Sequence, residues 1–307
     1  MATNKPITEM SHDEWLDERR KGIGGSDAGA LLGLSSYNTP LDVYLDKIGQ
    51  ADPIEDNDAM YWGRVLEDIV AAEYEKRSGN KVRRNNKILQ HKDHPFIMAN
   101  LDREIIGKNG ILECKTAGRA TEDWGPDGSD IVPTHYIAQV MHYMAVTGAD
   151  FADLAVLIGG RDFRIYHIPR DEEIIKMVID REIVFWTENV EARVAPDPVN
   201  INDINNLWPH DNGTLTAANA GDELDIQAAK EIKFQMKELK ARETELTNKI
   251  KESMGEISGL TDRSGKILVT WKERKSMRLD TKRLKVEQPE VYDHYVAESS
   301  SRTFLIK

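Results

Sequence analysis

The spacing of apolar residues predicts an α/β arrangement in the first two thirds of the chain. Leu66, Val70 and Tyr74 recur every four residues, which is helical spacing, and Gly79 follows as a helix end. Shorter apolar runs between turn residues predict strands. The predicted order is a helix, three strands, a helix, two strands and a helix, over residues 59–78, 82–89, 96–105, 110–116, 133–147, 153–159, 163–168 and 171–190. This order is typical of an α/β fold with a mixed central sheet flanked by helices.

Two short helices are predicted on either side of a glycine-rich turn near the start of the chain. Residues 15–21 have a charged, helical pattern that Gly24 and Gly25 end. The next helix is expected to begin at Ser26, because side-chain oxygens at a helix start accept hydrogen bonds from free backbone N–H groups. A further helix is expected to begin near Pro40.

The composition of the chain changes near residue 195, where proline, asparagine and aspartate residues gather. We predict a first domain over residues 1–195, a linker over residues 196–221 and a C-terminal extension over residues 222–307. The extension is expected to contain one long helix followed by a small basic α+β unit. A chain of this length suits one large domain with such an extension.

The long helix predicted over residues 222–254 has an apolar heptad pattern that Glu243 interrupts. Two interpretations fit this helix: a surface for a coiled-coil partner, or a clamp on the first domain. The block over residues 262–307 has eleven Lys and Arg against seven Asp and Glu. It predicts binding to a nucleic-acid backbone or to an acidic partner, and a solvated small domain is the alternative. The heptad residues are Ile232, Met236, Leu239, Leu246 and Ile250.

Net charge and cysteine content narrow the classes of function. The formal net charge of -12 argues against a passive nucleic-acid coat protein. The single cysteine, Cys114, excludes an internal disulfide and a cysteine-rich metal site. The N-terminus is polar and no stretch approaches the ~20 apolar residues of a membrane helix. We therefore expect a cytoplasmic protein with no signal peptide and no membrane contact.

Three charged residues on neighbouring predicted strands give the clearest chemical signal. Asp102 lies near the end of one strand, and Glu113 and Lys115 lie two residues apart on the next. Residues two apart on a strand point to the same face, so Glu113 and Lys115 project together. Carboxylates can hold Mg²⁺ or Mn²⁺ with positions left open for water and phosphate, and a lysine can offset charge on the phosphorus. Phosphodiester hydrolysis needs this combination.

Solvated surface charges are the simpler interpretation of such a pattern. However, the apolar runs Phe96–Leu101 and Ile111–Leu112 indicate a buried hairpin. Unpaired carboxylates are costly there unless a cation compensates them, so we predict a metal site. Further predicted ligands are the backbone carbonyl of Cys114 and the side chain of Glu67 on the preceding helix. Gln139, on the following helix, is expected to orient the attacking water.

Four sequence segments follow one another in the order of a known family. They are Arg20–Ala28, Gly63–Glu67, Leu101–Asp102 with Glu113–Lys115, and Tyr136–Gly148. Together they resemble the YqaJ viral recombinase family, the group of lambda exonuclease within the PD-(D/E)XK nuclease superfamily. Two positions depart from the pattern. Leu101 replaces the proline of the superfamily name, and Met141 stands where some relatives have a second glutamine.

The resemblance implies a PD-(D/E)XK nuclease core with two Mg²⁺ or Mn²⁺ ions per active site. It implies an exonuclease of a phage or prophage recombination system that degrades one strand of double-stranded DNA from a 5′ end. Such enzymes are often homo-oligomers in a trimeric ring, and they pass the remaining 3′ strand to a single-strand annealing protein of the RecT type. The alternatives are an endonuclease on the same core and a non-catalytic DNA-binding recombination scaffold.

Relatives in this family have a 5′-phosphate pocket in the segment that contains Arg19, Arg20 and Ser26. An arginine can donate two parallel hydrogen bonds to a phosphate, and a helix N-terminus favours anions. We expect Arg20 to meet the phosphate, with Arg19 as the alternative and Ser26 as a further donor. A simple helix end and restart, with Ser26 as the cap, is the alternative for the whole segment.

Several aromatic residues and histidines have less specific interpretations. Tyr61 and Trp62 could stack on a DNA base, but core packing is favoured for both. We interpret His135 as part of the rim of the active site. His142 is interpreted as a structural residue.

Overall fold

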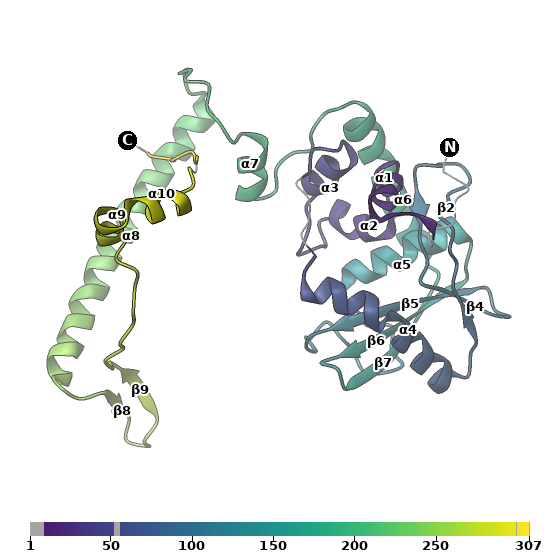
Figure 1. Cartoon of the computed structure of the whole chain (residues 1–307), viewed down its shortest axis with the longest axis horizontal. Coiled ribbons are helices and arrows are strands. Elements are labelled where there is room, and N and C mark those ends of the chain that lie inside the picture. The colour runs from purple at the N-terminus through teal and green to yellow at the C-terminus, as the bar shows by residue number, and fades with distance from the viewer. Residues whose placement is uncertain (1–8, 52–55, 299, 307) are drawn as a thin grey trace. The chain divides into compact units, whose positions relative to one another are not determined.

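Two compact units make up the chain, Met1–Leu207 and Trp208–Lys307. The structure is a computed structural model and describes residues 9–51, 56–298 and 300–306. The first unit contains the predicted alternation of helices and strands, and the second contains the predicted long helix (Figure 1). Among the described helices, none is both long and apolar enough to span a membrane.

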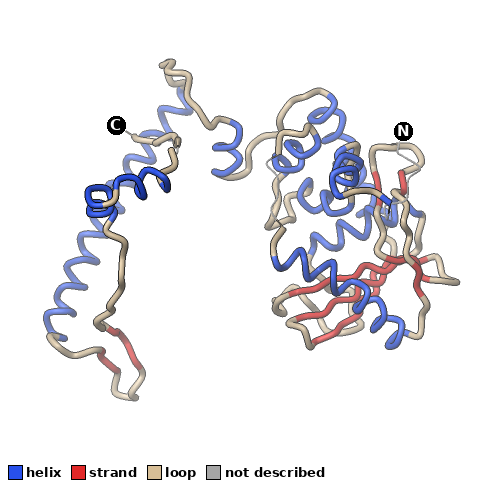
Figure 2. The backbone as a smooth tube through the Cα atoms, viewed as in Figure 1, coloured by secondary structure: helices blue, strands red, loops and turns tan. Residues whose placement is uncertain are grey.

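A five-stranded mixed sheet lies at the centre of the first unit, as Figure 2 shows in red. Its strands lie in the order β1 (Val82–Arg83), β4 (Arg103–Ile105), β5 (Gly110–Ala117), β6 (Phe151–Ile158) and β7 (Asp162–Pro169). β5 and β6 pair in parallel along their full length, and the other neighbouring strands pair antiparallel. The predicted α/β fold with a mixed central sheet is confirmed.

Helices of the first unit cover both faces of this sheet (Figure 1). The helices of this unit are α1 (His12–Arg20), α2 (Gly25–Leu31), α3 (Pro40–Lys47), α4 (Asp58–Ser78), α5 (Thr134–Thr147), α6 (Glu172–Phe185) and α7 (Ile201–Leu207). Tyr74 of α4 shares a core with Leu112 and Ala155 on one face of the sheet. α5 and α6 pack on the other face, where Leu154 and Val156 lie. Alternate residues of β6 therefore point into two different cores.

α2 lies directly against α5 because two of its glycines leave room for the contact. A Cβ atom at Gly25 would lie 2.4 Å from a ring carbon of Tyr143, and one at Gly29 would lie 2.9 Å from the Cβ of His135. A larger side chain at either position would push the helices apart. The contact brings the glycine-rich turn next to the helix that follows β5.

Two of the predicted strands are interrupted. Within residues 82–89, the Asn85 side chain accepts a hydrogen bond from the backbone N–H of Lys87 over 3.1 Å, which turns the chain. Residues 96–105 begin in a small two-stranded sheet and end in the five-stranded sheet, and Asp102 lies between the two parts. The pieces outside the central sheet are β2 (Leu89–Gln90) and β3 (Met98–Ala99), which pair with each other.

Several helix ends follow the predicted signals, but the helix expected to begin at Ser26 begins at Gly25, with Gly24 at its cap position. α4 ends where Gly79 takes a φ of 74°, a left-handed conformation that glycine adopts without strain. α3 begins at Pro40, and the preceding Thr39 caps it. The helix predicted to run to residue 190 changes type after α6 and continues as a π-helix, η2 (Trp186–Glu191).

Part of the segment predicted as a linker, residues 196–221, forms a helix of the first unit instead. This helix is α7, and its Asp203 is only 1% exposed. The Asp203 carboxylate accepts hydrogen bonds from Thr39 Oγ1 over 3.0 Å and from the backbone N–H of Val199 over 2.9 Å. A buried carboxylate needs such partners, and they attach α7 to the first unit.

The second unit is built around one long helix. Its elements are α8 (Ala220–Met254), β8 (Gly259–Thr261), β9 (Ile267–Thr270), α9 (Thr281–Glu287) and α10 (Pro289–Tyr295). The side chain of Asn219 caps the start of α8, and β8 and β9 form an antiparallel hairpin. Among the described hydrophobic residues of this unit, Met254 alone is buried. The helix predicted over residues 222–254 is confirmed.

Candidate active site

β5 carries two of the predicted site residues on one face. Glu113 and Lys115 lie two residues apart, and the Lys115 Nζ is 2.7 Å from the Glu113 Oε1. Cys114, between them, points the other way and packs against the core beneath α4. The Cys114 thiol is largely buried, and burial raises its pKa. It therefore stays protonated, so only its backbone carbonyl is suited to bind a cation.

Asp102 lies at the entrance to β4, beside these residues. The antiparallel register places Arg103 opposite Leu112, and the backbone N–H of Cys114 donates a hydrogen bond to Asp102 Oδ2 over 2.8 Å. Burial raises the pKa of Asp102, and the carboxylate of Glu113 raises it further. The structure therefore brings the two predicted carboxylates together in a buried place.

Gln139 reaches the same carboxylate from α5. Its Nε2 donates a hydrogen bond to Glu113 Oε1 over 2.8 Å and lies 3.0 Å from the hydroxyl of Tyr143. Lys115 contacts the same oxygen of Glu113. Both described contacts go to Oε1, which leaves Oε2 for another ligand. Gln139 thus holds a carboxylate in place, and its role in orienting an attacking water stays a prediction.

Lys115 has an environment that keeps it charged. Burial acts to lower its pKa, but the carboxylates of Glu113 and Asp102 outweigh burial, so the pKa is raised. The Nζ also lies 5.0 Å from the ring centre of Tyr136, within reach of a cation–π contact. A protonated lysine therefore lies beside two carboxylates, which is the predicted arrangement.

Arg103 is a component of the site that the sequence did not reveal. Its side chain is 5% exposed and lies 2.6 Å from Glu67 Oε1. It also contacts Asp68 on the same helix and donates to the backbone carbonyl of Asp102. Neighbouring residues alternate between faces in extended chain, so an arginine after Asp102 points toward α4. The alternation of neighbouring residues along an extended segment is the sequence signal that indicates Arg103.

One cavity of about 200 Å³ joins the carboxylates to the glycine-rich turn. The backbone N–H of Ile23 donates to the Phe96 carbonyl over 2.7 Å, and the Ile23 carbonyl accepts from the Met98 N–H over 2.8 Å. These bonds fix the turn beside the chain that leads to Asp102. The cavity is lined by Trp15, Arg19, Gly24, Gly25, Ser26, Ile88, Met98, Asn100, Asp102, Glu113, Gln139 and Tyr143.

The two neighbouring arginines of α1 have different partners. Arg19 lines the cavity and donates a hydrogen bond to Ser26 Oγ over 2.9 Å. Arg20 is 3.4 Å from Asp46 and 3.3 Å from Asp17 instead. Successive helical residues point roughly 100° apart, so the two side chains leave the helix in different directions. The structure places Arg19, the alternative to Arg20, beside Ser26, and the phosphate contact expected for Arg20 stays a prediction.

The donor atoms at this cavity fit a hard divalent cation. Asn100 Oδ1 is a buried acceptor that has no hydrogen-bond partner among the described residues. It lines the cavity together with the carboxylates of Asp102 and Glu113. Mg²⁺ and Mn²⁺ prefer oxygen ligands of this kind. The groups that would hold such an ion are Asp102, Glu113 and the Cys114 carbonyl.

Glu67, predicted as a further metal ligand, has another partner in the structure. It is paired with Arg103 and is absent from the lining of the cavity. Within residues 9–51, 56–298 and 300–306, no three His, Cys, Asp or Glu side chains are grouped as a ready metal site. The predicted pair of metal ions with Glu67 as a ligand stays a prediction.

Two histidines lie near the site. His135 is next to the charge of Lys115, and its pKa is lowered by burial and then by that charge. It is absent from the lining of the cavity, and its interpretation as a rim residue stays a prediction. His142 is fully buried, with Nδ1 2.7 Å from Glu182 Oε1 and Nε2 2.8 Å from the carbonyl of Met98. It thus ties α5 to α6 and β3, which fits a structural role.

Tyr61 and Trp62 are surface residues at the start of α4. Their side chains are 50% and 52% exposed, and their rings meet edge to face with centroids 5.4 Å apart. The interpretation as core residues is therefore wrong. The apolar core of α4 lies on the face that carries Val70 and Tyr74 instead.

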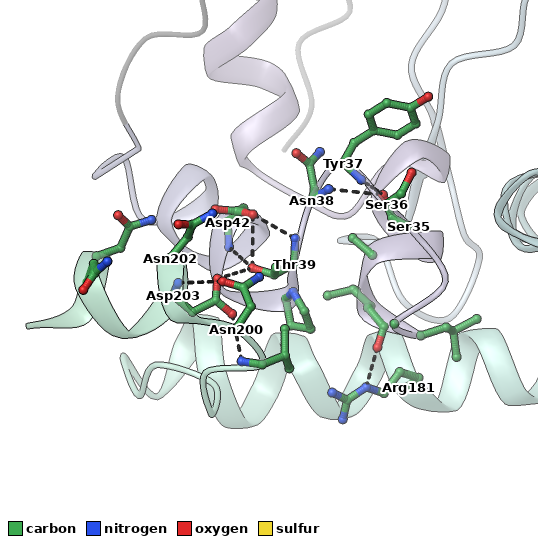
Figure 3. Close-up of a pocket in the computed structure, with 18 residues that line it drawn as sticks. Ser35, Ser36, Tyr37, Asn38, Thr39, Asp42, Arg181, Asn200, Asn202 and Asp203 are labelled. Carbon is green, nitrogen blue, oxygen red and sulfur yellow. Dashed lines mark hydrogen bonds between the residues drawn. The ribbon is translucent and has the colours of Figure 1, made fainter. Parts of the chain in front are cut away.

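A larger hollow of about 1250 Å³ lies between the loop that follows α2 and the helix α7 (Figure 3). Its polar side chains largely bond to one another or to nearby backbone, as Thr39 does to Asp203 and Arg181 does to the carbonyl of Leu31. None of the predicted site residues lines this hollow. The candidate active site is therefore the smaller cavity.

Comparison with known proteins shows which family contains this arrangement. The model of the YqaJ-like viral recombinase domain matches residues 14–150, which include every predicted site residue. A relative from Bacillus subtilis (strain 168), "Uncharacterized protein YqaJ", is 42% identical over 310 residues, which cover 98% of this chain and 95% of the relative. The chain belongs to the YqaJ-like viral recombinase family. The segments that predicted this family therefore identified it correctly.

Solved structures with a similar backbone have a lower sequence identity to this member of the YqaJ-like family. An alkaline exonuclease, LHK-Exo, from Laribacter hongkongensis is 19% identical with a TM-score of 0.46, over 59% of this chain and 94% of that chain. Its complex with dAMP gives 20% identity and a TM-score of 0.47 over the same shares. A phage related exonuclease from Haemophilus somnus 129PT gives 13% identity and 0.45, over 56% and 95%.

Proposed function

We propose that this chain is a metal-dependent nuclease that degrades one strand of double-stranded DNA from a 5′ end. Membership of the YqaJ-like viral recombinase family supports the proposal. The observation that carries it is the single cavity that contains both Arg19 with Ser26 and the carboxylates Asp102 and Glu113. Anion donors and metal-binding oxygens in one cavity suit a phosphate terminus held beside a phosphodiester bond.

Five side chains at the site have defined tasks in this proposal. Mg²⁺ or Mn²⁺ bound by Asp102 and Glu113 would lower the pKa of a water and polarise the phosphate. Lys115 carries a fixed positive charge that offsets the negative charge gathering on the reacting phosphate. Gln139 keeps Glu113 oriented, and the Arg19 guanidinium donates hydrogen bonds to the terminal 5′-phosphate.

Duplex DNA substrates that differ in their ends test the proposal. Linear DNA with a 5′-phosphate, linear DNA with a 5′-hydroxyl and covalently closed circular DNA are incubated with the protein and Mg²⁺. We expect mononucleotides from the 5′-phosphorylated strand, slower digestion of the 5′-hydroxyl substrate and an intact circle. EDTA should stop digestion. Cutting of the closed circle would show an endonuclease instead, and no cutting of any substrate would contradict the proposal.

The expected partners are part of the same proposal. The strand that remains after digestion has a 3′ end and is a substrate for a single-strand annealing protein. We propose that the nuclease acts as a homo-oligomer, such as a ring of three chains around DNA. Sedimentation equilibrium of the full chain tests the oligomer, and a monomer at the concentration used for digestion would contradict it.

A further inference from the structure

α8 presents an apolar stripe that the second unit leaves exposed. The spacing of its members places them at the two contact positions of a heptad repeat, on one side of the helix. Each residue is more than two fifths exposed, which is unusual for several large apolar residues on one side of a helix. We name this row the α8 stripe. It consists of Ile232 (56% exposed), Met236 (65%), Leu239 (67%), Leu246 (53%) and Ile250 (43%).

Basic residues flank the α8 stripe on both sides. In a heptad repeat, the positions next to the contact row set the choice of partner through their charge. Between residues 232 and 250 these flanking positions have four basic and no acidic side chains. The basic residues are Lys233, Lys240, Arg242 and Lys249.

Four of the acidic residues of α8 lie outside the contact row at a regular spacing. Glu231, Glu238, Glu245 and Glu252 recur every seven residues at one outer position of the repeat. Two of the flanking cations have partners within the helix: Lys249 lies 2.6 Å from Glu245, and Lys240 lies 2.5 Å from Glu243, all with exposed side chains. Exposed pairs of this kind contribute little, so the flanking cations remain available to a partner.

A second copy of α8 is an unfavourable binding partner for the α8 stripe. Glu243 lies in the contact row between Leu239 and Leu246. Parallel pairing in register would bury two copies of Glu243 against each other, which is costly for like charges. Antiparallel pairing would instead bring the basic flanks of the two helices together. Either arrangement is disfavoured by charge, as expected of a surface selected against self-pairing.

We propose that the α8 stripe binds an amphipathic helix of a partner protein whose own apolar row is flanked by acidic residues. Apolar contacts would cover Leu239, Leu246 and their neighbours, and the acidic flanks would pair with Lys233 and Arg242. The partner is expected to have a basic or polar residue opposite Glu243 in its contact row. The proposal goes beyond the nuclease activity and does not depend on it.

Two synthetic peptides of about four heptads test this surface. Both carry leucine and isoleucine in the contact row, with one lysine placed to face Glu243, and they differ only in having glutamate or lysine at the flanks. The full-length protein is titrated into each labelled peptide, and fluorescence anisotropy is measured at low and high salt. We expect the acidic peptide to bind and added salt to weaken it, and the basic peptide to bind about tenfold more weakly or not at all.

A charge-reversed protein is the matched variant. Lys233→Glu, Lys240→Glu, Arg242→Glu and Lys249→Glu are combined, and circular dichroism checks that the helix is retained. This variant should prefer the basic peptide, whereas Leu239→Ser with Leu246→Ser should bind neither. Equal binding of both peptides to the native chain, or binding that charge reversal leaves unchanged, would overturn the proposal. So would self-association that Leu239→Ser abolishes. Digestion of linear DNA by each variant is measured in parallel, so that a loss of nuclease activity is seen separately.

Discussion

Gln139 of α5 donates a hydrogen bond over 2.8 Å to the Glu113 carboxylate of β5. The contact joins a helix to the central strand at a position where both side chains are buried. A buried carboxylate with a fixed donor has little freedom to rotate, so its second oxygen keeps a constant direction. The geometry available to a metal ion at Glu113 therefore depends on a residue that need not touch the metal.

Substitutions at these two positions should have different consequences for DNA digestion. Glu113→Gln removes a charged ligand and should lower the rate with Mg²⁺ by about a thousandfold or more. Gln139→Ala should lower it by about ten- to a hundredfold, because the ligand is retained but less well oriented. Digestion of linear duplex DNA by Gln50→Ala, an exposed glutamine, provides the control. Near-normal digestion by Glu113→Gln would remove this residue from the site.

Arg19 and Arg20 should differ in their response to the DNA terminus. Arg19→Ala should slow digestion of 5′-phosphorylated duplex by roughly tenfold or more, because a charged donor to the phosphate is lost. The same change should have little effect on 5′-hydroxyl duplex. Arg20→Ala should affect both substrates equally and weakly, since Arg20 faces Asp17 and Asp46. A larger phosphate-specific loss for Arg20→Ala would reverse the assignment.

Asp27 should make the stability of the first unit depend on acid pH. Burial acts to raise its pKa, but Lys47, 2.8 Å away, and Arg19 outweigh burial and lower it below the ordinary value of 3.8. A lowered pKa contributes stability above pH 3.8, and this contribution is lost as the pH falls through the folded-state value. Urea unfolding of the native chain should therefore show a loss of stability below about pH 4.

Asp27→Asn isolates this contribution. At pH 7 it should reduce the free energy of unfolding by about 3 kcal/mol, because the buried Lys47 loses its nearest counter-charge and keeps only Asp46, 3.4 Å away. The difference from the native chain should shrink as the pH falls below about 4. Asp17→Asn, whose side chain is 71% exposed, should change stability by less than about 1 kcal/mol. A constant difference across the pH range would contradict the assigned role of Asp27.

Arg103 should matter for stability as well as for the site. Arg103→Gln would remove the buried partner of Glu67 and Asp68 and leave them only the more exposed Arg84, and it should reduce the free energy of unfolding by about 2–3 kcal/mol. Arg83→Gln is the matched control, because Arg83 is 70% exposed and pairs with Glu104 on the neighbouring strand. It should cost less than about 1 kcal/mol in urea unfolding. Equal losses for the two variants would argue against a special role for Arg103.

Features that depend on the local backbone were predictable from the sequence. Gly79 ends α4 because it adopts a left-handed conformation, and Pro40 begins α3 because it lacks a backbone donor. The pairing of Glu113 with Lys115 follows from the alternation of a strand. Each of these depends on residues a few positions apart.

Features that depend on side-chain direction across turns were not predictable. Which of Arg19 and Arg20 faces the cavity is decided by the angle at which α1 meets the rest of the unit. The breaks in the predicted strands depend on which sheet each segment joins. Glu67 pairs with Arg103 because of the way α4 packs, and the spacing of residues along the chain does not predict this contact.

The two backbone hydrogen bonds of Ile23 fix the distance between the two ends of the cavity. They join the turn next to Ser26 to the chain that leads to Asp102, and no side chain takes part in them. A terminus seated near Ser26 and a bond attacked near Asp102 would therefore be separated by a distance that the main chain sets. In the proposed nuclease, substitutions around the cavity would change how fast a fragment is released, but the size of the fragment would be set by the fold.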